Sequence, residues 1–392
     1  MDDKKRILAI VAINHAFNDS AVVIIPILLP VFKVLFNLSY TDIGVITGGG
    51  LLVTLISQLL IGRISDRKNK RLLLSLGILL LCATFLLFPL VHGFLTLLLI
   101  FFLHRFSASF FHPIGIAWIS KIFKKDRLDW AMGIQSALGD FGAFIAILTI
   151  PFIAEIKNWA YPFYIWTIIG ILCLFSVVLL THDLKEEKNI DNKDKKIDLR
   201  QSLFEDWNSI KKTKLFIPAF IVSGLAWSVI INYLPLLLSE RTSLSISLIG
   251  VVVSIWIGIG TIVCFSYGKI TSKIGRKKVV ILSYLTIGFM CIFLSIFTNL
   301  LILIFIIIFL GLATFLTYPA LFSFISEITD ENTEGKIFGY IFTIELAGGT
   351  IILLISGITS DIWGIWTPFM ILGVLSFLSV IPLIKIISKK TF

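Results

Sequence analysis

Long apolar segments constrain this chain more than any other feature of its sequence. Runs of about 20 apolar residues, each long enough to cross a hydrocarbon core of roughly 30 Å, recur along all 392 residues. The chain is 57% hydrophobic and only 15% charged, whereas soluble domains carry roughly 25% charged residues. The sequence therefore predicts an all-α membrane protein. Its twelve spans are expected at 7–36, 43–62, 72–91, 95–121, 129–154, 159–181, 215–238, 247–268, 278–297, 300–325, 335–358 and 364–387.

Basic residues predict how these spans are oriented. If the spans alternate in direction, 30 of the 34 Lys and Arg fall on the side that holds both termini. Because Lys and Arg concentrate on the cytoplasmic side, we expect both termini in the cytoplasm of a multi-pass protein of the cell (plasma) inner membrane. The net charge of +10 then suits anionic lipid, and no nucleic-acid partner is expected.

The start of the chain and its cysteines bear on three features, namely a cleaved signal peptide, a disulfide framework and a metal site. The start "MDDKKR" precedes a long apolar segment with no cleavage site, so we expect the first span to be retained. The four cysteines (Cys82, Cys173, Cys264 and Cys291) lie inside apolar runs, without disulfide or metal spacing. The sequence therefore predicts no metal site and no cofactor.

The two halves of the chain repeat at an offset of 206 residues. "SYTDIG" at 39–44 matches "SISLIG" at 245–250, and Pro113 matches Pro319. We therefore expect a six-helix bundle at 1–181, a cytoplasmic linker at 182–213 and a second bundle at 214–392. A parallel repeat of this kind surrounds a central cavity that opens to each side in turn. We expect the protein to act as a monomer.

Four charged residues lie deep inside spans. At 1.5 Å per helical residue, Asp19, Arg105, Asp140 and Glu345 are roughly 15–18 Å from the ends of their spans. A charge at that depth is costly, so each must face a cavity or find a partner. Asp19 could form a structural ion pair with Arg105. Alternatively, the acids could change protonation during transport, because a low-dielectric cavity favours a neutral acid and a nearby cation favours the ionised one.

Helical spacing adds polar neighbours to these charges. His15, Asn18 and Asp19 share one helix face, as do Arg105, Ser109 and His112, and as do Ser136 and Asp140. We expect these stripes to line one substrate cavity, although the rings of His15 and His112 could instead bond backbone carbonyls. The candidates from the second half are Trp227, Asn232, Tyr233, Thr317 and Tyr318.

A loop motif gives the sequence a family resemblance. "GRISDRKNKR" at 62–71 resembles the loop between the second and third helices of the major facilitator superfamily. Its matching residues are Gly62, Asp66, Arg67, Lys70 and Arg71. Asn69 stands where glycine is usual, and we expect it to adopt the left-handed backbone that asparagine tolerates. The resemblance covers the whole chain, and it implies two pseudo-symmetric bundles and a gating role for this loop.

A second resemblance is narrower. "NHAFNDS" at 14–20, "SASFFHP" at 107–113 and "GIQSALGDFG" at 133–142 are similar to the fosmidomycin-resistance-type drug exporters. This resemblance implies proton-coupled efflux of small molecules. The fifth span lacks the Gly-Pro pair usual in drug/proton antiporters, so the direction of transport stays open.

The sequence thus predicts a secondary transporter of a small molecule, coupled to protons, that exports drugs or metabolites. The alternative is a proton-coupled symporter of an organic anion held by Arg105. A membrane enzyme using His112 is a remote third possibility, because no nucleophile or metal motif accompanies it. The expected partners are a small-molecule substrate, protons and the lipid bilayer.

Overall fold

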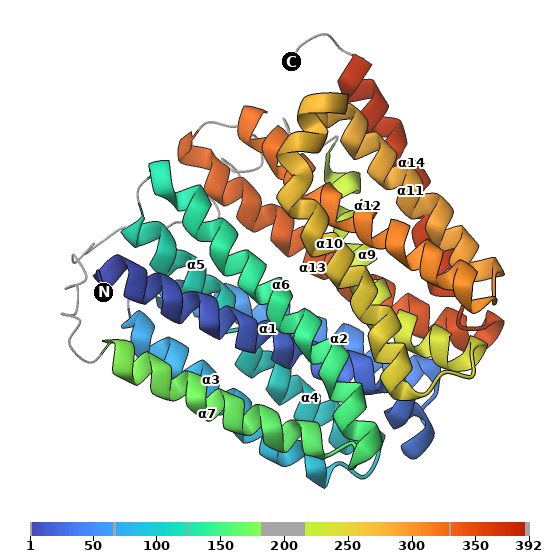
Figure 1. Ribbon diagram of the computed structural model, residues 1–392, viewed down its shortest axis with the longest axis horizontal. Coiled ribbons are helices and arrows are strands. Elements are labelled where there is room, and N and C mark those ends of the chain that lie inside the picture. The colour runs from blue at the N-terminus through green and yellow to red at the C-terminus, as the bar shows by residue number, and fades with distance from the viewer. Residues whose placement is uncertain (1, 66–67, 124, 182–215, 329–330, 389–392) are drawn as a thin grey trace. The chain divides into compact units, whose positions relative to one another are not determined.

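A computed structural model describes residues 2–65, 68–123, 125–181, 216–328 and 331–388. The described part of the chain is helical (Figure 1). Its elements are α1 (Asp3–Leu35), α2 (Tyr40–Ser65), α3 (Lys70–Leu87), η1 (Phe88–Leu90), α4 (Phe94–Ala108), α5 (Phe111–Ile122), α6 (Lys125–Ile156), α7 (Tyr161–Thr181), α9 (Ile217–Arg241), α10 (Ile246–Ile274), α11 (Arg276–Ile296), α12 (Leu300–Ile328), α13 (Glu331–Trp363) and α14 (Thr367–Ser388).

Twelve helical segments of the described chain are long and apolar enough to cross a membrane. They fall where the sequence predicts them, with ends that differ by a few residues. The fourth span is broken: α4 ends at Ala108 and α5 begins at Phe111. Pro113 explains the break, because it has no N–H to bond the carbonyl of Ser109 one turn earlier.

The helix starts confirm the repeat. Adding 206 to the first residues of α2, α3, α4, α6 and α7 gives the first residues of α10, α11, α12, α13 and α14. The copies differ at their prolines, because α12 runs on through Pro319 whereas its counterpart breaks before Pro113.

The chain forms two compact units. The first comprises residues 1–188 together with 231–257, and the second comprises 189–230 together with 258–392. In the first unit α1 lies along α6, and α3 lies along α7 (Figure 1). In the second unit α11 packs against both α12 and α14. The domain limits expected from the sequence stay a prediction, and the whole expected linker, 182–213, lies outside the described residues.

A close crossing joins α1 to α6. A Cβ atom on Gly142 of α6 would lie 2.1 Å from the carbonyl oxygen of Ala16 on α1. Only a glycine lets two helices approach so closely, as small residues do in other membrane helix pairs. This crossing holds the polar side chains of α1 against α6.

The two turns that flank α2 each contain an asparagine, and the left-handed one is not the one that the sequence predicts. Asn37, after α1, has a positive φ of 49°, and Leu38 N–H bonds the Lys33 carbonyl at 3.0 Å, which is the pattern of a Schellman helix end. Asn69 was expected to be left-handed, and this is wrong. Its φ is −61°, and its side chain caps α3 by accepting the Leu72 N–H. The counterpart of Asn69 in the repeat is Gly275, which has a φ of 83°.

Candidate functional site

The predicted polar face of α1 meets α6 in the first unit. His15 Nδ1 lies 2.8 Å from the backbone carbonyl of Gln135 on α6. Because a carbonyl only accepts hydrogen bonds, this nitrogen carries the proton. The other ring nitrogen, Nε2, lies 3.1 Å from Asp19 Oδ2 one helical turn away. Asn18 Nδ2 donates to the second carboxylate oxygen, Oδ1, at 3.4 Å.

His112 reaches the same carboxylate from α5. Its Nε2 lies 3.7 Å from Asp19 Oδ1, and its ring meets the His15 ring edge-on at 5.2 Å. Phe111 stacks on the other side of His15 at 4.6 Å. The alternative that His112 bonds a backbone carbonyl freed by Pro113 is wrong for this structure, whereas His15 does bond a carbonyl, on a different helix.

Arg105 does not pair with Asp19. Its Nε donates to Thr54 Oγ1 on α2 at 2.9 Å, and no described carboxylate lies within the 4.0 Å of an ion pair. The expected structural pair between Asp19 and Arg105 is therefore not formed. Ser109 is fully buried, and its hydroxyl donates to the Arg105 carbonyl one helical turn earlier at 2.6 Å. Its proton is therefore already used in a bond within its own segment of the chain.

Two expected residues of α6 stand apart from this cluster. Ser136 is exposed, and its hydroxyl accepts a hydrogen bond from Gln135 Nε2 at 3.0 Å. Asp140 is half-buried and has no hydrogen bond or ion pair within the described chain. Between them, Gly139 provides the space for the cluster. A Cβ atom on Gly139 would lie 2.7 Å from the His15 ring and 2.9 Å from Asp19 Oδ2.

Glu345 of α13 is the deep acid of the second unit. It is 6% exposed, and its Oε1 has no hydrogen-bond partner among the described residues. Its side chain packs on Gly224 of α9, where an added Cβ would lie 2.8 Å from Glu345 Cβ. By the 206-residue offset, Glu345 corresponds to Gly139 in the first half. In both halves a carboxyl therefore packs against a glycine. The carboxyl lies on α1 and its glycine on α6 in the first half, whereas in the second half the carboxyl lies on α13, the counterpart of α6, and its glycine on α9.

The remaining candidates of the second half lie in both units. Trp227 is half-buried and meets the Phe315 ring at 5.8 Å, and Tyr318 is also half-buried. Asn232 and Tyr233 are buried and belong to the first unit. Thr317 is buried and accepts a hydrogen bond from Ser223 at 3.1 Å.

The predicted gating loop is described only in part. Asp66 and Arg67 lie outside the described residues. Gly62 lies near the end of α2, and a Cβ atom added to it would lie 3.8 Å from Pro113 Cβ. Lys70 Nζ lies 3.5 Å from the Ser65 carbonyl, and Arg71 donates to the Thr181 carbonyl at 2.9 Å.

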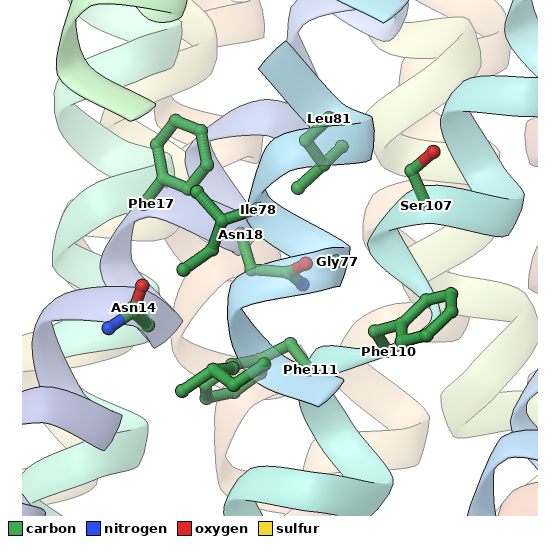
Figure 2. Close-up of a pocket in the computed structure, with 10 residues that line it drawn as sticks. Asn14, Phe17, Asn18, Gly77, Ile78, Leu81, Ser107, Phe110 and Phe111 are labelled. Carbon is green, nitrogen blue, oxygen red and sulfur yellow. The ribbon is translucent and has the colours of Figure 1, made fainter. Parts of the chain in front are cut away.

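A small cavity adjoins the cluster, because Asn18 and Phe111 line it (Figure 2). Its volume is about 10 Å³, which holds roughly one water molecule. It is lined by Asn14, Asn18 and side chains of α3, α4 and α5, and Asn14 Oδ1 has no partner in the described chain. A single water would satisfy this oxygen, but the cavity is too small for an organic substrate.

Sequence analysis missed several residues that build these sites. Gln135 orients His15 through its backbone, which leaves no trace in the residue type. Phe111 and Thr54 were missed because the sequence contains many phenylalanines and threonines in apolar segments, and nothing distinguishes these two from the rest. In the second unit, Tyr284 donates to the Ala219 carbonyl at 2.6 Å and bonds Ser223 at 2.7 Å. A buried tyrosine hydroxyl needs a hydrogen-bond partner. That need is the one sequence signal that could have predicted a polar contact at Tyr284.

Comparison with known proteins gives a consistent result. The family model described as Major Facilitator Superfamily matches residues 8–351 and 219–390. An uncharacterized MFS-type transporter of Methanocaldococcus jannaschii is 24% identical over 86% of this chain and 89% of its own length. Multidrug resistance protein 2 of Bacillus subtilis is 25% identical over 89% of this chain and 87% of its own length. Among solved structures, a D-xylose-proton symporter superposes with a TM-score of 0.78 at 14% identity, covering 97% of each chain.

Proposed function

Because the chain belongs to the major facilitator superfamily, and so is a multi-pass membrane transporter and not an enzyme, we propose that it exports small amphipathic molecules in exchange for protons. It works as a monomer in the cell (plasma) inner membrane, with both termini in the cytoplasm. The similarity to a multidrug resistance protein supports efflux, and so do the helix motifs shared with the fosmidomycin-resistance-type exporters.

The observation that carries proton coupling is the isolation of Glu345. A buried carboxylate without a partner is costly, so a group in this position is stable only when it is protonated or when a cation reaches it. Tyr284 is a titratable group of the described chain close enough to interact electrostatically with Glu345, and on α9 Glu345 packs against Gly224, which has no side chain to bond it. Exposure of Glu345 to water during each transport cycle would release its proton.

The other expected coupling residues take supporting places in this proposal. Asp140 is half-buried beside the α1–α6 crossing, and it would carry a second proton. Asp19 is already held between two imidazoles. The loop of Gly62, Asp66, Arg67, Lys70 and Arg71 acts as a cytoplasmic latch, as the family resemblance implies.

One observation favours uptake of an organic anion instead. Arg105 has no carboxylate within ion-pair distance in the described chain, and only its Nε is bonded, to Thr54. Its terminal nitrogens are therefore available to hold a carboxylate or phosphate in two parallel bonds. This second candidate uses the same helices but reverses the relation between substrate and proton movement.

Transport in proteoliposomes tests both candidates. The purified chain is reconstituted, and the uptake of ethidium, an amphipathic cation, and of benzoate, an organic anion, is measured with the proton gradient imposed in either direction. Proton-coupled export predicts that ethidium moves in the direction opposite to the flow of protons. Glu345→Gln should abolish this uphill movement but leave downhill exchange of ethidium intact. Benzoate uptake that follows inward protons supports the symporter, and gradient-independent movement of both probes refutes proton coupling.

A further inference from the structure

We infer that His15, Asp19 and His112 form a binding site for a divalent transition-metal cation such as Zn²⁺. The inference is independent of the transport proposal, because it concerns binding to the first unit and needs no gradient. His15 and Asp19 lie one helical turn apart on α1, and His112 of α5, just after the break in the fourth span, reaches the same carboxylate.

The spacing of the ligand atoms fits a metal ion. One atom from each of the three side chains lies within 4.8 Å of the other two. The His15 Nε2–Asp19 Oδ2 distance is 3.1 Å and the His112 Nε2–Asp19 Oδ1 distance is 3.7 Å. Neighbouring ligands of an ion with bonds of about 2.1 Å lie roughly 3.0–3.5 Å apart. A small side-chain movement would therefore bring all three into the coordination sphere.

The hydrogen bond on the far side of His15 favours the same conclusion. Because Nδ1 donates its proton to the Gln135 carbonyl at 2.8 Å, a neutral His15 directs the lone pair of Nε2 at Asp19. Two acceptors then face each other, and a cation between them satisfies both. Metal-binding histidines are usually oriented by such a bond from the other ring nitrogen to a carbonyl. Phe111, stacked on His15, further fixes the plane of the ring.

The ligand set selects the class of cation. Two imidazoles with one carboxylate suit Zn²⁺, Fe²⁺, Co²⁺ or Ni²⁺, whereas Mg²⁺ and Ca²⁺ prefer oxygen ligands only. Arg105 is the nearby fixed positive charge that would oppose a bound cation, and its Nε is held by Thr54 on α2. The side chains of His112 and Asp19 are 39% and 25% exposed, so helix packing does not fully enclose them.

Gly139 sets the size of the site. Its missing side chain leaves the space that the His15 ring and Asp19 occupy, since an added Cβ would approach them to 2.7–2.9 Å. Gly139→Ala therefore displaces two ligands without changing any of them. Gly133→Ala is the matched control, because it lies on the same helix and an added Cβ would meet nothing within 4 Å.

Metal titration of the tag-free, full-length chain in detergent tests the inference. Zn²⁺ binding is measured by calorimetry, and the coordination of Co²⁺ by its visible absorption, with Mg²⁺ as the control ion. We expect one site per chain that binds Zn²⁺ and Co²⁺ but not Mg²⁺. Asp19→Asn and His112→Gln should weaken binding by at least about 100-fold, which exceeds the 10- to 100-fold typical of outer-shell changes.

The remaining variants separate this site from a surface site or a folding defect. Gly139→Ala should weaken Zn²⁺ binding, whereas Gly133→Ala and His92→Gln, which removes an exposed histidine, should bind as the unmodified chain does. Thermal unfolding without metal shows whether each variant is folded, and the half-exposed His112 is the ligand whose loss should perturb folding least. No binding by the unmodified chain, or equal binding by His112→Gln, means that the cluster is only an ion pair and overturns the inference.

Discussion

The α1–α6 crossing can be tested by replacing Gly142 with alanine. The added Cβ would lie 2.1 Å from the Ala16 carbonyl oxygen, which is about 1.3 Å short of the 3.4 Å at which ordinary contact begins. The atoms that it meets are backbone atoms of α1, so no side-chain rotation relieves the clash and the helices must separate. Overpacking of this kind costs up to about 3 kcal/mol, and the better helix propensity of alanine returns about 1 kcal/mol.

The expected net loss for Gly142→Ala is therefore about 2 kcal/mol. Gly133→Ala meets no neighbouring atom and should gain up to about 1 kcal/mol from helix propensity alone. Thermal unfolding of both variants in the same detergent should differ by several degrees, since 1 kcal/mol shifts the midpoint by roughly 2–4 °C in proteins of 150–250 residues. Equal midpoints for the two variants would refute the close crossing, and with it the placement of His15 against Gln135.

Three further predictions follow from single contacts. Arg105→Lys should reduce transport as strongly as Arg105→Ala, because lysine lacks the planar fork that bonds Thr54 and a substrate anion together; near-normal flux in proteoliposomes would show that only the charge matters. Asn69→Ala should lower the unfolding midpoint through the loss of a cap worth about 1 kcal/mol, whereas Asn69→Gly should lower the stability by only a few tenths of a kcal/mol. A higher midpoint for Asn69→Gly than for the unmodified chain would mean that the turn is left-handed after all. Glu155 accepts hydrogen bonds from the backbone N–H (2.9 Å) and the hydroxyl of Ser247, so a short bis-methanethiosulfonate crosslinker should join Glu155→Cys to Ser247→Cys and stop transport until a reductant is added; full activity of the crosslinked form would mean that this contact is kept throughout the cycle.

The helices of this protein could be predicted because the bilayer imposes a strict rule on length and polarity. The repeat was equally visible, since a constant offset of 206 carries over to five pairs of helix starts. Helix ends were less predictable where a proline acts. The two copies place Pro113 and Pro319 at the same register, yet only the first copy breaks, because packing around the helix decides whether the lost hydrogen bond is tolerated.

The contacts of the candidate site were predictable only within a helix. The spacing of His15 and Asp19 fixed their common face, and the structure keeps it. Contacts between helices depend on rotation and depth, which sequence periodicity does not supply. Arg105 and Asp19 lie at similar depths in their spans, but Arg105 turns to Thr54, and the side chains within ion-pair distance of Asp19 in the described chain are two imidazoles.

The exchange of carboxyl and glycine between the halves gives the two deep acids, Asp19 and Glu345, different surroundings. In the first half Asp19 stands on α1 over Gly139 of α6, and in the second half Glu345 stands on α13 over Gly224 of α9. The crossing has room for one carboxyl, so the opposite residue must be glycine in each case. Asp19 shares its crossing with His15, whose counterpart in the second half is Ile221, and His112 has Tyr318 as its counterpart. If both proposals hold, the imidazoles around the acid of the first half share a cation with it, whereas Glu345 of the second half, which has no such neighbours among the described residues, is neutralised by a proton.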